Sequence, residues 1–211
     1  MAANDPSLQS AIDAMALPGV IIGHRLILPG DEHMLKPEEA LALSRVVVKR
    51  RRASGAARIV ARQLLFRIGY PGCSLPNAPS GAPVWPAGVV GSLAHDRDVA
   101  VAAVAKVDRI AALGIDVEPA EELPPDLIDY IATPKERRGV DSQPYYGRLL
   151  FAAKEAVYKA VHPLDGIFLE HHDVEIDFAE RTGTVSNGRV VEVRFCHSTH
   201  LIAVAFICAR S

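Results

Sequence analysis

Residues 48–68 repeat apolar side chains at the three- and four-residue spacing of an amphipathic helix. The repeating positions are Ala57, Val60, Ala61, Leu64, Leu65 and Ile68. Gly69 stands where a helix C-terminal cap belongs, and residues 69–88, rich in proline, glycine and serine, predict a loop. A second helix is predicted over residues 149–161, and we expect Pro163 to end it. The pattern therefore predicts one long helix in each half of the chain.

Short apolar runs between turn signals predict strands in both halves. The predicted strands cover residues 20–28, 89–94, 99–104, 115–118, 174–178, 191–195 and 201–207. Asn187-Gly188 is a strong hairpin signal, because these residues tolerate the positive φ values that a tight turn requires. Short helices are expected within residues 1–18 and from Pro37. Helices combined with antiparallel strands predict the α+β fold class.

Composition and charge describe an ordinary globular chain. Its 211 residues can form one sizeable core or two small ones, and 49% of them are apolar. A net charge of −2 gives no global basic field, so we expect no nucleic-acid partner. No apolar run reaches the roughly 18 residues of a membrane helix, and the first residues do not resemble a signal peptide, so we expect no membrane partner. Three widely spaced cysteines fit a reducing compartment, and we expect a cytoplasmic protein.

Two segments carry the candidate chemistry. A predicted strand that reads Gly-Ile-Asp-Val-Glu-Pro presents Asp116 and Glu118 on one face, because alternate strand residues share a face. Glu155 lies on the second long helix between Lys154 and Lys159. Taken singly, such acids more often face solvent, and a Glu–Lys pair four residues apart contributes only about 0.3 kcal/mol. Together, three carboxylates beside fixed cations suit a hard divalent metal and a polyphosphate ligand.

Four segments form an ordered set of motifs. Residues 81–86 read Gly-Ala-Pro-Val-Trp-Pro, and residues 90–95 read Val-Gly-Ser-Leu-Ala-His. Residues 114–118 read Gly-Ile-Asp-Val-Glu, and residues 151–159 read Phe-Ala-Ala-Lys-Glu-Ala-Val-Tyr-Lys. In this order the segments resemble motifs of the 4'-phosphopantetheinyl transferases, in particular the pseudo-dimeric class typified by the surfactin and enterobactin enzymes. Each motif alone is modestly specific, but the ordered set is highly specific.

The resemblance implies an organisation that the sequence does not display as a residue-level repeat. Two similar subdomains would each pack a long helix on a small antiparallel sheet, and a pseudo-twofold axis would relate them. We place them at residues 1–108 and 109–211. The active site would lie between the subdomains, and the second would carry the metal site.

For activity, the resemblance implies a Mg2+-dependent enzyme that transfers 4'-phosphopantetheine from coenzyme A to a serine of an acyl or peptidyl carrier protein. Adenosine 3',5'-bisphosphate would be released. Asp116, Glu118 and Glu155 would hold Mg2+, and Glu155 or a metal-bound water near it would be the general base. The catalytic residues would be Asp116, Glu155 and Lys159. Siderophore, polyketide and fatty-acid carriers remain open as substrates, and we expect a monomer.

The same resemblance assigns coenzyme A contacts. Arg51, Arg58 and Arg62 share one face of the first long helix, which would ordinarily be a solvated face. In the family, arginines at the positions of Arg58 and Arg62 would reach the 3'-phosphate, and a guanidinium suits phosphate because its fork binds two oxygens. The remaining predicted contacts are His95, Lys154 and Lys159. We expect Lys49, Arg50 and Arg52 to lie on the surface.

Some residues depart from the family pattern. Ala94 often corresponds to serine or threonine, Asp96 to a small or thiol residue, and Ser80 to lysine or arginine. These departures leave open a decayed coenzyme A- or carrier-binding module. A metal-dependent nucleotide phosphodiesterase or hydrolase is the alternative enzyme class. His171 and His172 look metal-like, but adjacent side chains diverge on a strand, so we assign them no metal.

Overall fold

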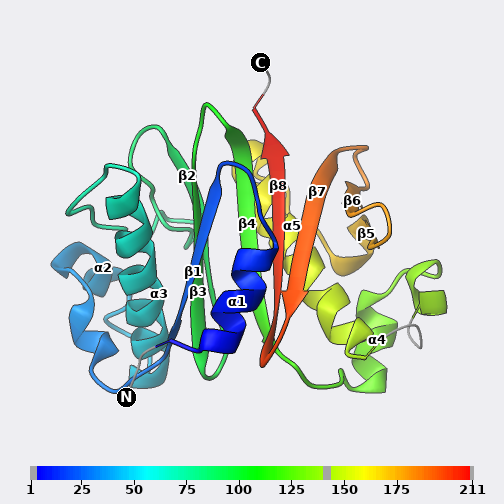
Figure 1. Ribbon diagram of the computed structural model, residues 1–211, viewed down its shortest axis with the longest axis horizontal. Helices are drawn as coiled ribbons and strands as arrows, with labels where there is room; N and C mark the ends of the chain where they lie inside the picture. Colours follow the sequence, from blue (N-terminus) through cyan, green and yellow to red (C-terminus); the bar gives the residue numbers. More distant parts are fainter. Residues whose placement is uncertain (1–3, 140–143, 210–211) are drawn as a thin grey trace.

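Two antiparallel sheets, each covered by one long helix, make up the computed structural model, which describes residues 4–139 and 144–209 (Figure 1). The N-terminal half contains α1 (Pro6–Ala14), β1 (Val20–Leu26), η1 (Asp31–Met34), α2 (Pro37–Ala42), α3 (Val48–Arg67), β2 (Val89–His95) and β3 (Val99–Lys106). The C-terminal half contains β4 (Ile110–Pro119), α4 (Pro125–Ile131), η2 (Glu136–Gly139), α5 (Tyr146–Asp165), η3 (His171–Asp173), β5 (Val174–Asp177), β6 (Thr182–Val185), β7 (Val190–His197) and β8 (His200–Cys208). The predicted α+β class is confirmed.

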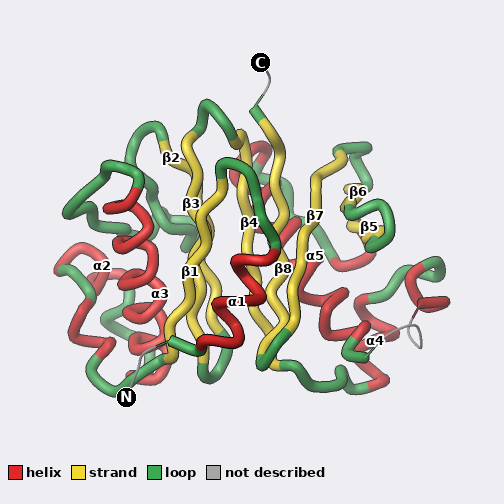
Figure 2. Tube along the Cα trace, in the orientation of Figure 1, coloured by secondary structure: helices red, strands yellow, loops and turns green. Residues whose placement is uncertain are grey.

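The sheets differ in size but share one plan. The N-terminal sheet has the strand order β1-β3-β2 and the C-terminal sheet has the order β4-β8-β7-β6-β5, with antiparallel neighbours throughout. α3 packs on the first sheet and α5 on the second. Figure 2 shows the strands gathered in the middle of the molecule, with α3 on one side. Each subdomain thus combines a long helix with an antiparallel sheet, as the resemblance implies.

One apolar core joins the two sheets. On β3, Val101 belongs to this core, whereas its neighbour Ala102 packs towards α3. On β8, Val204 faces the same inter-sheet core, whereas Ala203 packs towards α5. Strands buried on both faces read as continuous apolar runs, which explains why both sequences lack alternation. The layers are therefore helix, sheet, sheet and helix.

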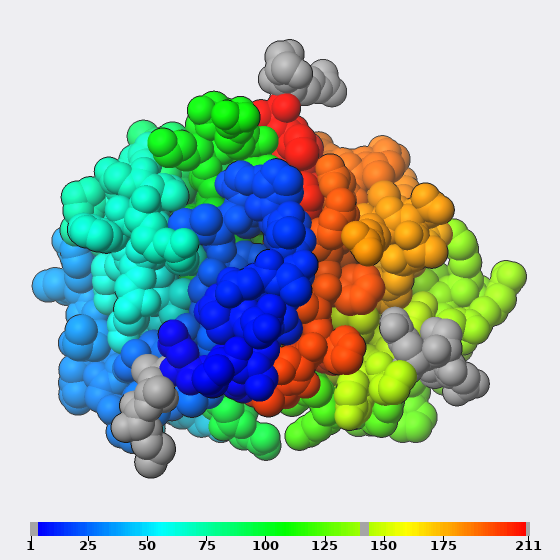
Figure 3. All heavy atoms as spheres, viewed as in Figure 1, coloured from blue at the N-terminus to red at the C-terminus, as the bar shows by residue number. Residues whose placement is uncertain are grey.

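The N-terminal helix closes part of this core. Leu8 and Ile12 of α1 are buried in the inter-sheet cluster. The carboxylate of Asp5 caps the helix by accepting hydrogen bonds from the backbone N–H groups of Ser7 and Leu8. In the space-filling view, α1 lies over the seam between β1 and β7 (Figure 3). In the described part of the chain, no helix has the length and apolar character that a membrane crossing requires.

Three local features differ from the sequence prediction. The prediction that the second long helix ends at Pro163 is wrong. α5 continues to Asp165 and is capped by Gly166, whose φ is 69°. A proline in the last turn removes only one N–H donor, so the helix can pass through it. The sequence pattern predicts neither α4 nor β6. The prolines at the start of α4 look like residues that interrupt regular secondary structure, and β6 is only four residues long.

The proposed division into residues 1–108 and 109–211 falls in the turn between β3 and β4. The inter-sheet core crosses this division, because it includes residues of β3 as well as β4 and β8. We therefore propose two subdomains that share the inter-sheet core, while each also has a buried cluster beneath its own long helix.

Candidate active site

A close contact between β4 and α5 depends on Gly114. A Cβ atom at this position would lie 2.0 Å from the carbonyl oxygen of Ala156, so only glycine lets the helix backbone rest on the strand. The contact brings Lys159 to the end of β4. Its Nζ donates to Asp116 Oδ1 at 2.6 Å and to the carbonyl oxygen of Ile115 at 3.3 Å. The strand end and the helix that carry the candidate chemistry are therefore adjacent.

Asp116 occupies an unfavourable position for a carboxylate. The residue is 7% exposed, and its Oδ2 has no hydrogen-bond partner among the residues that the structure describes. Burial raises the pKa of Asp116; the Lys159 ammonium opposes this shift, and the charge of Glu155 adds to it. The half-buried Glu155 on α5 is thus an electrostatic neighbour of Asp116.

Glu118 has a similar environment. Burial, followed by the charge of Asp116, raises the pKa of Glu118 to about 7, and Arg148 opposes this shift. The guanidinium of Arg148 lies 3.2 Å from the Glu118 carboxylate. The sequence reasoning missed Arg148, although it lies three residues before the Phe-x-x-Lys-Glu motif and one helical turn from its start.

These acids fit a divalent cation. Asp116, Glu118 and Glu155 offer hard oxygen ligands, and the unpartnered Oδ2 of Asp116 is a free ligand atom in a place that disfavours bare negative charge. Within residues 4–139 and 144–209, however, no group of three or more His, Cys, Asp or Glu side chains is already arranged to hold a metal. Asp116 is therefore an electrostatic neighbour of both Glu118 and Glu155, but the described residues do not form a preassembled metal site.

A pocket of about 560 Å³ lies between the two halves and reaches Lys159. Its N-terminal wall comes from α3, from the loop before β2 and from β2, and its C-terminal wall comes from β4 and α5. Among its polar and aromatic lining residues are Arg50, Arg58, Asn77, Trp85, His95, Tyr158, Lys159 and His162. Because both halves contribute cations, the pocket favours an anionic ligand that spans the seam.

His95 stands at the end of β2, exposed towards this pocket. Desolvation of the imidazole ring by the surrounding protein atoms lowers the pKa of His95, and the charges of Lys159 and Arg50 lower it further. An anion bound here would offset both cations and so favour the charged form of His95. His95, Arg50 and Lys159 thus form one group, drawn from three elements, that suits an anion.

Similar sequences identify the family. Residues 37–105 match the 4'-phosphopantetheinyl transferase N-terminal domain, and residues 112–206 match the 4'-phosphopantetheinyl transferase superfamily. The 4'-phosphopantetheinyl transferase Npt of Nocardia iowensis is 37% identical over 82% of this chain and 79% of its own. This chain belongs to the 4'-phosphopantetheinyl transferase family.

Other known proteins are similar as well. The 4'-phosphopantetheinyl transferases PptT of Mycobacterium tuberculosis and Svp of Streptomyces mobaraensis are each 39% identical to this chain. The PptT match covers 74% of this chain and 70% of PptT, and the Svp match covers 72% and 64%. Among solved structures, the holo-[acyl-carrier-protein] synthase of Thermotoga maritima matches 48% of this chain and 65% of its own, at 24% identity and a TM-score of 0.36. This TM-score and this identity are too low to support a conclusion about this chain.

The protein is therefore an enzyme that transfers phosphopantetheine from coenzyme A to carrier proteins. Family membership favours this reaction over the hydrolase and the decayed binding module. The pocket between the halves and the acids at the end of β4 are the candidate site of this reaction.

Of the three arginines predicted to contact coenzyme A in this transferase, only Arg58 lines the pocket. Arg58 lines the pocket but is only 3% exposed, and its Nε donates to the carbonyl oxygen of Leu75 at 2.9 Å. It also donates to the side-chain oxygen of Asn77. Arg58 can therefore present only part of its guanidinium to a ligand.

Arg62 and Arg51 lie outside the pocket lining. Arg62 donates to both carboxylate oxygens of the buried Glu39 at 3.0 Å and to the carbonyl oxygen of Met34 at 2.8 Å. The prediction that Arg62 binds phosphate does not agree with this geometry, because the guanidinium already has three acceptors. Arg50 is exposed, as expected, and it also lines the pocket. Four consecutive basic residues cannot be told apart by sequence without knowing where the pocket lies.

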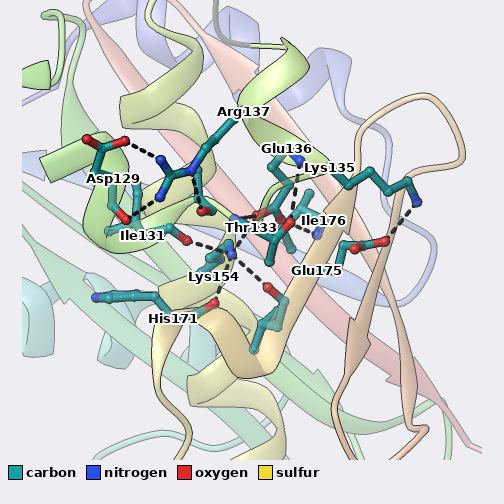
Figure 4. Close-up of polar contacts among 12 residues, drawn as sticks. Asp129, Ile131, Thr133, Lys135, Glu136, Arg137, Lys154, His171, Glu175 and Ile176 are labelled. Atoms are coloured by element: carbon teal, nitrogen blue, oxygen red, sulfur yellow. Dashed lines mark hydrogen bonds and ion pairs between the residues drawn. The ribbon is translucent and has the colours of Figure 1, made fainter.

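Lys154 has a structural role that contradicts its predicted phosphate contact (Figure 4). It is 2% exposed, and its Nζ lies within 2.7–2.8 Å of four oxygens. These acceptors are the Glu136 carboxylate and the carbonyls of Ile131, His171 and Val174. An ammonium has three protons, so nothing is left for a ligand. Lys154 therefore links α5 to the segments that precede it and follow it in the sequence.

The three departures from the family pattern have different consequences. Ala94 is 6% exposed and belongs to the inter-sheet core, so it does not face the pocket. Ser80 lines the pocket and contributes no charge, where the resemblance implies a cation. Asp96 does not line the pocket. Its carboxylate accepts hydrogen bonds from the backbone of its own turn and pairs with His200, so it does not oppose an anionic ligand directly.

Proposed function

We propose that this transferase works with Mg2+ held by Asp116, Glu118 and Glu155. The observation that carries the proposal is the buried Oδ2 of Asp116, which lacks a partner among the described residues, on a carboxylate whose Oδ1 accepts from Lys159, a residue that lines the pocket. When bound, Mg2+ would offset negative charge on the pyrophosphate of coenzyme A. Binding of a cation would also remove the repulsion that raises the pKa of Glu118.

Coenzyme A would occupy the pocket between the halves. Arg50, His95 and Lys159 supply positive charge from α3, β2 and α5, so they can hold phosphates whose charge would otherwise be costly to desolvate. Arg58 would offer what remains of its guanidinium, and Trp85 would offer an aromatic face. This arrangement replaces the predicted contacts of Arg51, Arg62 and Lys154.

The chain's own residues would perform the transfer by positioning and charge. Glu155 would accept the proton of the carrier serine as its oxygen attacks the β-phosphorus of coenzyme A. The bond from that phosphorus to the oxygen of the adenosine 3',5'-bisphosphate leaving group would break in line with the attack. Lys159 would stabilise the charge that develops on the phosphoryl oxygens, for which it would have to release Asp116.

The carrier protein would dock beside the end of α5. Phe168 is 75% exposed, and its ring lies 5.8 Å from that of Tyr158, edge to face. Tyr158 lines the pocket, as does the partly exposed Leu164. An exposed apolar surface at the rim suits the apolar face of a partner that must insert a serine. We propose that Leu164, Ile167 and Phe168 form this surface.

Three further properties complete the proposal. A pocket completed by two halves of one chain supports a monomer. Three free cysteines support a cytoplasmic location. The resemblance to the surfactin and enterobactin class suggests carriers of siderophore or polyketide biosynthesis.

The decisive experiment is the intact mass of candidate apo-carrier proteins after incubation with the enzyme and coenzyme A. We expect a shift of one phosphopantetheine group with Mg2+ and none after chelation. A shift that persists without divalent metal would overturn the Mg2+ proposal. Consumption of coenzyme A without a carrier would instead indicate a hydrolase.

A further inference from the structure

The turn between β2 and β3 carries a pocket residue at its start, since His95 is followed directly by Asp96. Asp96 Oδ1 accepts hydrogen bonds from the backbone N–H groups of Asp98 and Val99, both at 2.7 Å. The backbone N–H of Asp96 donates to the carbonyl oxygen of Val99 at 2.9 Å. One carboxylate oxygen therefore holds the turn in shape, and the other is free for a different task.

That other oxygen contacts the opposite half of the molecule. Asp96 Oδ2 lies 3.1 Å from Nε2 of His200, the first residue of β8, and the two side chains are only 8% and 13% exposed. His200 pairs in the sheet with Pro119, the residue after Glu118 on β4. Its Nδ1 lies 3.2 Å from the hydroxyl of Thr199. The turn of the N-terminal sheet is thus tied to the strand end that carries the acids.

This turn also concentrates the ionic contacts between the halves. Among the described residues, two ion pairs cross from the N-terminal to the C-terminal subdomain: Asp96 with His200, and Arg97 with Glu121. The second joins two exposed side chains at 4.0 Å, so solvent screens it strongly. Asp96–His200 is therefore the one partly buried ionic link across the seam in the described chain, and it adjoins His95.

We propose that the Asp96–His200 pair is a positioning device for coenzyme A binding. It holds the turn that bears His95 against the C-terminal half, and so fixes the separation between His95 and Lys159. A polyanion that spans the seam needs the His95 imidazole and the Lys159 ammonium at the correct distance before it arrives, because pre-organised contacts lose less entropy on binding. His200 and Asp96 act through His95 and touch no substrate. The inference rests on the proposed role of His95 in coenzyme A binding.

Electrostatics support the geometry. The hydrogen bond to Asp96 raises the pKa of His200 against the opposing effect of burial, and the charges of Asp96, Asp98 and Asp5 add to the rise. Burial would raise the pKa of Asp96, but His200 and the turn N–H groups outweigh it and lower that pKa. Each partner thus favours the charged form of the other, as in a formed ion pair.

The test compares steady-state kinetics of four single variants with those of the wild-type enzyme. His200→Ala removes the contact, His200→Gln keeps a donor near the position of Nε2, and Asp96→Asn keeps the turn acceptor but loses the charge. His197→Gln, in the same hairpin and exposed, is the matched control. We expect His200→Ala to raise the KM for coenzyme A roughly fivefold to tenfold while kcat stays within about twofold. Asp96→Asn should do the same, His200→Gln should recover part of the loss, and His197→Gln should match the wild type.

A double-mutant cycle with His95→Ala separates the two proposals. If His200 acts through His95, His200→Ala should add little to the KM of the His95→Ala enzyme. Additive effects, or loss of kcat in step with melting temperature, would show a general structural role and overturn the inference. A raised KM in His95→Ala with no change in His200→Ala and Asp96→Asn would overturn it and leave the proposed role of His95 intact. An unchanged KM in His95→Ala would overturn both.

Discussion

Neutralising Asp116 should stabilise this enzyme in the absence of divalent metal while it abolishes transfer. In Asp116→Asn, the side-chain carbonyl can still accept from Lys159, but the buried negative charge is gone. The wild-type carboxylate is 7% exposed, and its Oδ2 has no partner among the described residues. Most single substitutions lower stability, so a gain here would indicate a carboxylate that is kept for function at a cost in stability.

The magnitude follows from two opposing terms. A buried polar group without a partner costs about 1–3 kcal/mol, and more when it is charged, so the gain comes from replacing a charged unpartnered oxygen by a neutral amide nitrogen. Weakening the pair with Lys159 costs up to about 1 kcal/mol, because that side chain is 28% exposed and can turn to solvent. The net expectation is a gain of about 1–2 kcal/mol, which for a chain of this size raises the melting temperature by roughly 2–8 °C.

The dependence on pH has a definite sign. Because the pKa of Asp116 is raised in the folded protein, the folded state binds its proton more tightly than the unfolded state does. The wild type therefore loses stability as pH rises from the usual aspartate range through the raised pKa. The advantage of Asp116→Asn should be absent in acid, where both side chains are neutral, and should grow to its full value above the folded pKa.

Melting curves with and without Mg2+ complete the assay. Ligand at about 100 times its dissociation constant contributes about 2.7 kcal/mol to a protein that binds it, so saturating Mg2+ should stabilise the wild type and leave Asp116→Asn unchanged. The order of the two melting temperatures should then reverse. If Asp116→Asn is less stable than the wild type at neutral pH without metal, the pair with Lys159 satisfies the carboxylate and the reasoning is refuted.

Three further substitutions test the residue assignments. Lys154→Met should leave Glu136 buried without its cation and lower the free energy of unfolding by about 3–5 kcal/mol in urea titrations; a raised KM for coenzyme A at full stability would restore the phosphate role. Arg50→Gln should weaken coenzyme A binding roughly 10- to 100-fold in titration calorimetry, whereas the matched Arg51→Gln should not; equal effects would contradict the pocket lining. Phe168→Ala should raise the KM for carrier protein more than that for coenzyme A in separate titrations, and a defect limited to coenzyme A would place this side chain in the nucleotide pocket.

The sequence alone was sufficient for the two long helices, most of the strands and the family. The apolar spacing over residues 48–68 predicts α3, and the run through residues 201–207 predicts β8, because periodicity depends only on local geometry and burial. Asp116 and Glu118 share a face for the same local reason. The ordered motifs indicate the phosphopantetheinyl transferases without any information about tertiary contacts.

The tertiary structure decided what each charged residue does. Arg50 reaches the pocket and Arg51 does not, although they are adjacent, because the position of the C-terminal half determines which side of α3 faces the seam. Lys154 and Lys159 belong to one motif, yet one is enclosed by four oxygens from distant segments and the other lines the pocket. A side chain's role depends on the partners that folding brings to it, and for these residues the partners lie 17 to 44 positions away in the chain. Local patterns carry no information about such partners.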